Sequence, residues 1–194
     1  MEIGATKAVQ DRLKTTKIEE SKGASLVFCW DTHLTKIKGR NVLFIVNASN
    51  RYTIAMTDIE PRNWNYYTMY IRSVIHGVMQ EMGYSEDQIG QYFKMSGDTT
   101  ITKTHGRKSV GGINRMVMDA QYFGKKLEKE AKYQWELSEY LNRDICQPEG
   151  FDAYGYPSEL FKLDMERLGI VAKRKPAKVI DFSQYIESNR GTND

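Results

Sequence analysis

Cysteine is scarce in this chain, and no long apolar segment occurs. The 194 residues include only Cys29 and Cys146, which lie far apart and fit no disulfide or metal-binding spacing. A reducing compartment is therefore expected. The longest apolar runs have about five residues, as at 42–46, whereas a membrane-spanning helix needs about 20. Because residues 1–7 also lack the basic-then-apolar order of a signal peptide, the sequence predicts a cytoplasmic location and no membrane partner.

Charge of one sign is not in large excess either. The 28 basic and 25 acidic residues give a net charge of +3 and are largely interspersed along the chain. Nucleic-acid-binding domains usually gather their basic residues on one face or along one helix. Net charge therefore leaves the class of partner open. With 40% apolar residues, the chain has the composition of a globular protein rather than a disordered one.

Catalytic motifs are missing as well. The loop 106–112 resembles the end of a phosphate-binding loop, but the glycine that such a loop needs five residues earlier is absent. There is no Gly-x-Ser-x-Gly turn, and no pair of carboxylates lies in an apolar stretch that would raise one pKa. We therefore expect a protein that is not an enzyme and has no cofactor, and we keep an enzyme with a scattered site as an alternative.

Three side chains near the first tryptophan are of metal-ligating types. In an extended segment, Cys29, Asp31 and His33 point to the same face. A structural zinc site needs four ligands, and no second Cys/His pair lies nearby in the sequence. We therefore expect ordinary core or surface side chains here and no metal site.

Residues 33–57 carry the strongest strand signal. Apolar and polar residues alternate over 34–38, and the runs 42–46 and 52–57 are rich in β-branched and aromatic residues. Turn-forming residues separate the three segments. The pattern predicts a three-stranded antiparallel meander.

Shorter elements are predicted around the meander from periodicity and helix caps. They are a strand at 2–5, helices at 7–13, 64–82 and 85–95, and a strand at 99–104 that pairs with an edge of the meander.

The predicted fold class is α+β: an antiparallel meander sheet packed by helices, with a helical C-terminal extension. A long helix is predicted from about 109 to 142, and its charged second half is expected to project from the core. The composition changes after Pro148. We therefore divide the chain into a core domain, residues 1–145, and a C-terminal extension with a short helix and a flexible tail, residues 146–194.

Aromatic residues form two clusters in the sequence. One lies at the start of the predicted 64–82 helix and the other in a loop at 151–157. Surplus aromatic side chains are typical of protein interfaces. The candidate protein-interface residues are Trp64, Tyr66, Tyr67, Tyr70, Tyr154 and Tyr156. The alternative is that about half of the aromatic residues simply cover the sheet.

A second set of candidates is basic. The loop before the predicted 109–142 helix places backbone N–H groups where helix N-termini bind phosphate, and an ordinary solvated turn is the alternative. The candidates for nucleic-acid or anion binding are His105, Arg107, Lys108, Arg115, Lys173, Arg174 and Lys175.

Two turn residues of the meander, Asn50 and Arg51, are a third set of candidates. A fixed loop of this kind often recognises a partner. The alternative is a role in the turn itself, with asparagine satisfying the backbone and arginine solvated. The residue types favour the turn.

Several segments resemble a small bacterial domain family of unknown function, which is also found fused in front of plasmid-type open-reading-frame proteins. The matching segments are 3–7, 28–30, 46–52, 100–104 and 112–115. They span about residues 1–123, and the Asn-x-x-Asn-Arg-Tyr element at 47–52 is the most specific of them. A histidine often follows the tryptophan in this pattern, where this chain has Asp31. The resemblance brings no activity, but it implies a mobile-element setting.

These features favour a non-catalytic protein-binding protein of bacterial, phage or plasmid origin. One version is an inhibitor of a host defence nuclease, of the anti-CRISPR type, that blocks a nucleic-acid-binding or domain-docking surface. The partner is then a protein, such as a nucleic-acid-processing complex. The alternatives are a nucleic-acid-binding module that uses the basic loop and the run 173–175, and an enzyme with an unrecognised site.

Overall fold

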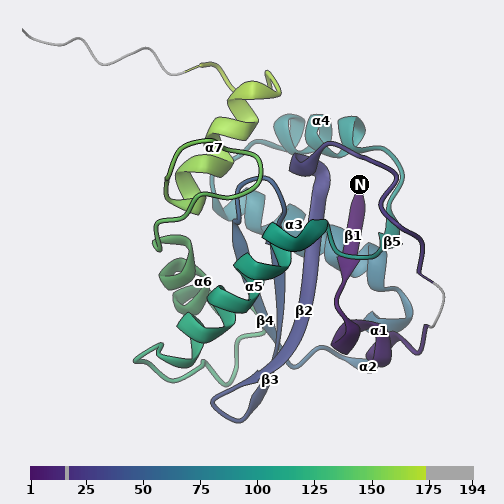
Figure 1. Cartoon of the computed structure of the whole chain (residues 1–194), viewed down its shortest axis with the longest axis vertical. Coiled ribbons are helices and arrows are strands. Elements are labelled where there is room, and N and C mark those ends of the chain that lie inside the picture. The colour runs from purple at the N-terminus through teal and green to yellow at the C-terminus, as the bar shows by residue number, and fades with distance from the viewer. Residues whose placement is uncertain (16–17, 174–194) are drawn as a thin grey trace, which may run out of the picture.

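The computed structural model describes residues 1–15 and 18–173, which contain a five-stranded sheet (Figure 1). The strands are β1 (Glu2–Ala5), β2 (Cys29–Ile37), β3 (Arg40–Asn47), β4 (Thr53–Thr57) and β5 (Thr100–Thr102). Their order in the sheet is β4-β3-β2-β1-β5. The predicted meander is confirmed, because β2, β3 and β4 pair antiparallel.

The sheet as a whole is mixed rather than antiparallel. β1 lies between β2 and β5 and is parallel to both. Parallel neighbours need a long crossover connection, and α1 (Lys7–Leu13) with the segment after it provides one between β1 and β2. The prediction of an antiparallel sheet was therefore wrong outside the meander. The prediction for residues 99–104 was also wrong in its partner, because β5 pairs with β1 and not with a meander strand.

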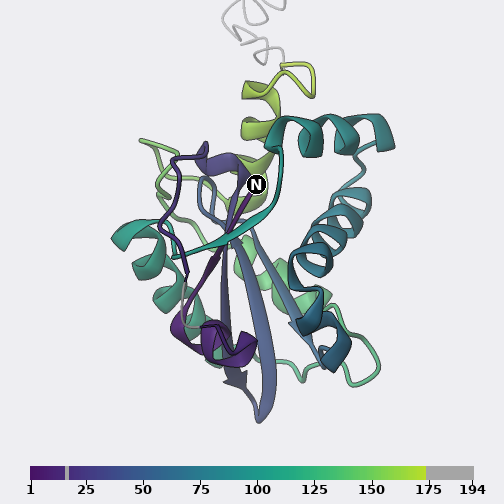
Figure 2. The same ribbon diagram turned by 90° about the vertical axis from the view of Figure 1, so that its right-hand side faces the viewer.

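Helices cover both faces of the sheet, which Figure 2 shows edge-on between them. Besides α1, they are the 3-10 helix η1 (Leu26–Phe28), α2 (Pro61–Asn65), α3 (Tyr67–Glu81), α4 (Glu86–Ser96), α5 (Gly106–Gln121), α6 (Trp135–Asn142) and α7 (Pro157–Arg167). Alternation along β3 sends Leu43 and Ile45 into a first core cluster with α3, α4 and α7. It sends Phe44 and Val46 into a second cluster with α5 and α6.

The helix predicted from 109 to 142 is interrupted by residues 122–134. In this connection the buried Gln134 side chain accepts a hydrogen bond from the N–H of Glu128 at 2.8 Å. It also donates to the Glu128 carbonyl oxygen at 2.9 Å and to the Thr57 hydroxyl at 3.0 Å. These bonds satisfy a non-helical backbone and tie it to β4. The prediction of one long helix was therefore wrong.

α6 lies along the free edge of β4 instead of projecting from the core. The Ser138 hydroxyl accepts a hydrogen bond from the N–H of Ala55 at 3.0 Å. The Asn142 amide accepts from the N–H of Thr53 and donates to its carbonyl oxygen, both at 2.8 Å. An unpaired edge strand is a template for association with other chains. Side chains of α6 therefore take the place of a sixth strand, and the predicted projection was wrong.

The described part of the C-terminal extension also packs on the core. Phe161 and Met165 of α7 are buried in the first cluster. Cys146 and Gly155 exchange backbone hydrogen bonds, which close the aromatic loop between them. The predicted flexible tail at the end of the chain lies outside the described residues, which end at residue 173. Within residues 1–15 and 18–173, none of the helices combines the length and apolar character that crossing a bilayer requires.

Leu137→Ala tests whether α6 belongs to the core. Leu137 is 1% exposed in the second cluster, so its truncation should lower the free energy of unfolding by about 2–5 kcal/mol. Ile145→Ala is the matched control, because Ile145 is 56% exposed and its truncation should change that free energy by less than about 0.5 kcal/mol. Urea denaturation followed by circular dichroism measures both variants. Equal effects would contradict the packing of α6 on β4.

Candidate functional site

A buried group of ionisable side chains lies where β1, β2 and the start of α5 meet. In the register of the sheet, Glu2 is opposite Cys29 and Gly4 is opposite Asp31. Because side chains alternate along strands, the residues of these two pairs share one face. His105, the residue before α5, lies over that face and contacts both Asp31 and Glu2. We call the following four residues the ionic cluster: Glu2, Asp31, His105 and Ser109.

Asp31 is the centre of the ionic cluster. It is fully buried, and its Oδ1 lies 2.7 Å from Nδ1 of His105. The backbone N–H of His105 approaches both carboxylate oxygens, at 3.2 and 3.3 Å. The Ser109 hydroxyl donates to Oδ2. Asp31 therefore accepts a hydrogen bond from the His105 N–H, which has no partner within α5. In many helices a carboxylate at the start of the same helix accepts such a bond, whereas here it comes from β2.

Glu2 holds the other nitrogen of the same imidazole. Its Oε2 lies 3.0 Å from Nε2 of His105. The same carboxylate accepts hydrogen bonds from the Ser21 hydroxyl at 2.6 Å and from the Lys22 N–H at 2.8 Å. The His105 side chain, 3% exposed, thus bridges two buried carboxylates that come from neighbouring strands.

The electrostatics of the cluster favour a charged imidazole. Burial lowers the pKa of His105, but hydrogen bonds and charge interactions with Asp31 and Cys29 outweigh burial and raise this pKa to about 10. Burial likewise raises the pKa of Glu2, but hydrogen bonds from Ser21, Lys22 and His105 outweigh it and hold the pKa below 4.5. Because the folded pKa of His105 lies above its ordinary value of 6.5, its contribution to stability is complete below that value. The contribution is lost as the pH rises through about 10.

Gly4 leaves the space that the Asp31 carboxylate occupies. A Cβ atom on Gly4 would lie 1.8 Å from Oδ1 of Asp31 and 3.0 Å from the backbone Cα of Thr104. Glycine inside a strand often marks such a close approach. It is the local sign in the sequence that a side chain crosses β1 at this point.

The three metal-ligating side chains of β2 do not converge on one point. Asp31 is buried in the ionic cluster and Cys29 beside it, whereas Nδ1 of the half-buried His33 lies 3.2 Å from the Thr6 hydroxyl. His105 takes the place next to Cys29. The donor atoms of Glu2, Cys29 and His105 lie within 4.8 Å of one another.

The predicted interface residues divide into exposed and buried ones. Tyr66, Tyr154 and Tyr156 are 67%, 70% and 50% exposed. Tyr67 is buried and stacks on Trp64, with ring centroids 5.5 Å apart. The half-buried Tyr70 packs against the first core cluster. In the aromatic cluster of α2 and α3, Tyr66 is therefore on the surface, whereas the other members pack in or against the core.

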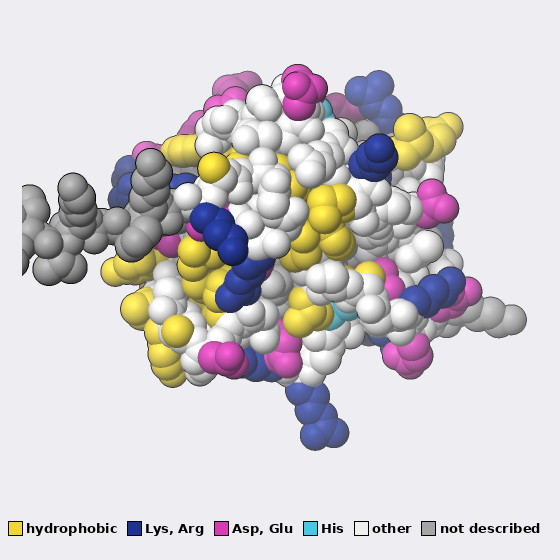
Figure 3. Space-filling view, turned by 90° about the horizontal axis from the view of Figure 1, so that it is seen from above, with side chains coloured by type: hydrophobic (Ala, Val, Ile, Leu, Met, Phe, Trp, Pro, Cys, Tyr) yellow, Lys and Arg dark blue, Asp and Glu magenta, His cyan; other side chains and the backbone are white. Residues whose placement is uncertain are grey.

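The basic candidates are dispersed. His105 is buried, Arg115 pairs with Asp119 at 3.2 Å, Arg107 and Lys108 are exposed at the start of α5, and Lys173 is exposed beyond α7. Arg174 and Lys175 lie outside the described residues. On the face that carries α4 and α7, basic, acidic and hydrophobic side chains alternate without a field of one sign (Figure 3).

The turn residues of the meander have different environments. Asn50 is fully buried; its Oδ1 accepts from the N–H of Tyr52 at 2.9 Å, and its Nδ2 donates to Asp164 of α7 at 2.9 Å. Burial raises the pKa of that aspartate. Arg51 has a φ of 63° and, with Lys108, lines a cavity of about 50 Å³ at the start of α5. Ligand pockets are several times larger, at about 300 Å³ or more.

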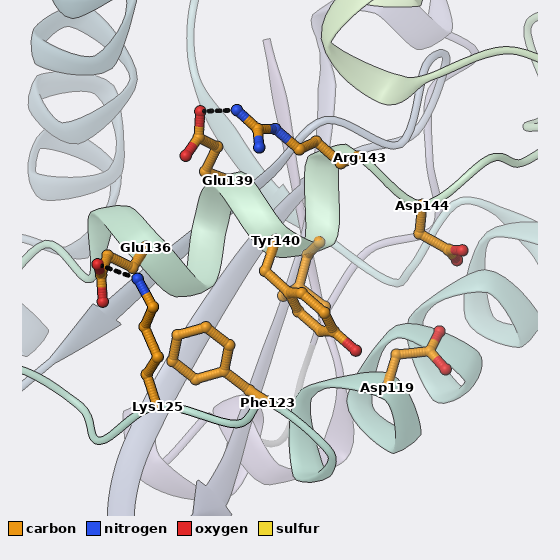
Figure 4. A pocket seen from close by; sticks show the side chains of 9 residues that line it. Asp119, Phe123, Lys125, Glu136, Glu139, Tyr140, Arg143 and Asp144 are labelled. Carbon is orange, nitrogen blue, oxygen red and sulfur yellow. Dashed lines mark hydrogen bonds and ion pairs between the residues drawn. The ribbon is translucent and has the colours of Figure 1, made fainter.

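A larger pocket lies between the end of α5 and α6, with a volume of about 410 Å³ (Figure 4). Its lining residues are Asp119, Phe123, Lys125, Glu136, Glu139, Tyr140, Leu141, Arg143 and Asp144. Tyr140 is 42% exposed, and the centroid of its ring lies 5.5 Å from that of Phe123. Lys125 forms an ion pair with Glu136. We call this site the acidic pocket.

The chain is thus an α+β protein with a mixed five-stranded sheet, a buried ionic cluster and an acidic surface pocket. It belongs to the domain family of unknown function DUF6933, whose model matches residues 2–160. The resemblance inferred from the sequence is confirmed, and the match extends beyond residue 123 to the first residues of α7. No curated protein and no solved structure matches the chain.

Gly4→Ala tests the close approach of Asp31 to β1. The added methyl group must displace the carboxylate from His105, so the free energy of unfolding should fall by about 3–5 kcal/mol, as when a buried ion pair is broken. The matched control is Gly77→Ala in α3, where a Cβ meets nothing within 4 Å. That change should stabilise the helix by about 0.5–1 kcal/mol. Thermal and urea unfolding separate the two results, and a neutral Gly4→Ala would contradict the geometry.

His105→Gln removes the positive charge between the two carboxylates. Glu2 and Asp31 then stay buried without a cation, so a loss of about 3–5 kcal/mol in unfolding free energy is expected at pH 7. His76→Gln is the control, because His76 pairs with Glu86 on the exposed surface. Its effect should stay within about 1 kcal/mol. Similar losses for the two variants would argue against a buried imidazolium.

Proposed function

We propose that this chain is a non-catalytic protein-binding protein that receives a basic side chain of its partner in the acidic pocket. The observation that carries this proposal is the lining of the pocket, where carboxylates surround an exposed tyrosine ring. Its volume of about 410 Å³ is within the range of sites that enclose a ligand group.

The charges of the pocket favour a cation. Four carboxylates and two cations line it, which leaves a formal excess of two negative charges on a chain whose net charge is +3. Three of the four carboxylates are paired: Glu139 with Arg143 at 2.7 Å, Glu136 with Lys125, and Asp119 with Arg115, which lies outside the lining. Asp119 and Asp144 lie on the side of Tyr140 that carries the hydroxyl group (Figure 4). Within the part of the chain that the structure describes, no Lys, Arg or His forms an ion pair with Asp144.

The aromatic ring adds selectivity for arginine or lysine. A guanidinium or ammonium group is attracted to the face of a tyrosine ring, and a planar guanidinium also bonds carboxylates in pairs. Two further exposed aromatic residues, Tyr122 and Trp135, mark the end of α5 and the start of α6. In protein interfaces a few residues carry most of the binding energy, and tyrosine and tryptophan are common among them.

An inhibitor of a host defence nuclease is one partner relation that this chemistry suits. Nucleic-acid-binding surfaces are rich in arginine and lysine. A protein whose acidic pocket binds an arginine or lysine of such a surface would compete with the phosphate backbone of the nucleic acid for that side chain. The nuclease itself stays a prediction from the mobile-element setting.

Tyr140→Ala tests the pocket, with Tyr154→Ala as the matched control on the closed aromatic loop. Partners captured from bacterial lysate by the wild-type chain are identified by mass spectrometry, purified and titrated calorimetrically. Tyr140→Ala should weaken binding by about tenfold or more, equivalent to ~1.4 kcal/mol, and Tyr154→Ala should not. If Tyr154→Ala loses binding and Tyr140→Ala does not, the partner binds the aromatic loop instead of the acidic pocket, which contradicts the proposal.

Charge reversal provides the second arm of the test. Asp144→Lys should abolish capture, because it places a cation where the partner's cation is expected. Asp152→Lys makes the same charge change at an exposed position of the aromatic loop and should have little effect. Absence of any stoichiometric protein partner, or binding of nucleic acid that both variants retain, would overturn the proposed function.

A further inference from the structure

Three side chains with different metal-ligating groups converge beside the ionic cluster. They are the carboxylate of Glu2, the thiol of Cys29 and the Nε2 atom of His105. All three residues are buried, and they come from β1, β2 and the residue that precedes α5. We propose that Glu2, Cys29 and His105 bind a divalent transition-metal ion of the zinc type.

The spacing of the donor atoms suits a metal ion. They lie within 4.8 Å of one another, and Oε2 of Glu2 is 3.0 Å from Nε2 of His105. Tetrahedral zinc binds oxygen, nitrogen and sulfur at about 2.0–2.3 Å, which places its ligands roughly 3.5 Å apart. Side-chain adjustments of about 1 Å therefore complete three of the four positions, and a water molecule is the expected fourth ligand.

The types of donor select the class of metal. Thiolate with imidazole and carboxylate is a ligand set for zinc and related late transition metals, whereas calcium and magnesium prefer oxygen alone. Asp31 acts as a positioning residue. Its bond to Nδ1 of His105 leaves Nε2 as the ligating atom, as in the carboxylate–histidine–zinc arrangement of many metal sites.

The Cys29 side chain can change partners when a metal ion binds. Its Sγ atom lies 3.7 and 3.5 Å from the carbonyl oxygens of Ala24 and Ser25, which are long hydrogen bonds. Metal ligands bind without their protons, so any proton on Sγ of Cys29 or on Nε2 of His105 passes to solvent as the bond to the ion forms.

Glu2 has the freedom that coordination needs. Its other hydrogen bonds come from Ser21 and the backbone of Lys22, in an exposed segment between α1 and η1. The carboxylate can therefore turn toward the ion while β1 keeps its pairing with β2 and β5.

The test uses the tag-free full chain after treatment with a chelator. Zn²⁺ is added, excess is removed by dialysis, and retained metal is measured by mass spectrometry. One ion per chain is expected. Co²⁺ should give a thiolate-to-cobalt charge-transfer band in the near ultraviolet, and X-ray absorption of the zinc form should show one sulfur ligand at about 2.3 Å.

The two buried cysteines provide a matched pair of variants. Cys29→Ser should abolish the charge-transfer band and lower metal affinity by about 100-fold, whereas Cys146→Ser should retain both. Asp31→Asn should lower affinity by about 10–100-fold while the sulfur ligand stays. Circular dichroism reports whether each variant folds.

Two results on the wild-type chain would overturn the proposal even if the variants do not fold. One is a folded protein that retains no zinc or cobalt. The other is a retained ion whose spectra contain no sulfur ligand, which would place the metal elsewhere. Loss of the charge-transfer band in Cys146→Ser instead of Cys29→Ser would also contradict the site.

Discussion

The buried ion pair between Asp31 and His105 is the constraint on which the rest of the structure depends. Neither charge is stable out of water without the other, because the cost of desolvation is offset only by close pairing and full hydrogen bonding. The pair joins β2 to the first turn of α5, and Glu2 extends it to β1. It therefore fixes the start of α5 beside the parallel strands β1 and β2, while the rest of the helix packs on β3 and β4. It also requires glycine at position 4, because the carboxylate occupies the space above that residue.

At the opposite edge of the sheet, α6 packs against β4. The same helix also lines the acidic pocket of the proposed binding function. Its inner side buries Leu137 and satisfies the β4 backbone through Ser138 and Asn142. Its outer side presents Tyr140 and Glu139 to the acidic pocket. A helix that is fixed to the sheet by both apolar and hydrogen-bonding contacts holds a pocket in place, which lowers the entropy lost on binding.

The sequence predicted elements whose signals are local. Alternation identified the meander, and the Ser85–Gln88 capping box marked the start of α4. The sequence did not predict the parallel pairing of the four-residue β1, the break before α6 or the ionic cluster, because each depends on contacts between distant segments. The non-helical connection before α6 is held by a hydrogen bond from the Gln134 side chain to Thr57 of β4. His105 contacts Glu2, which lies 103 positions earlier in the sequence. The Cys29 and Asp31 pattern identified the right face of the strand, but its histidine came from the start of α5.

Nitrogen-15 NMR of the imidazole rings in the metal-free full chain at pH 8 tests the central claim most directly. The account predicts that both ring nitrogens of His105 carry protons, because its pKa of about 10 lies well above that pH. His33, whose pKa is lowered by burial, is the internal reference and should show a neutral ring. A neutral ring for His105 at pH 8 would contradict the claim that a buried imidazolium between Asp31 and Glu2 holds the fold together.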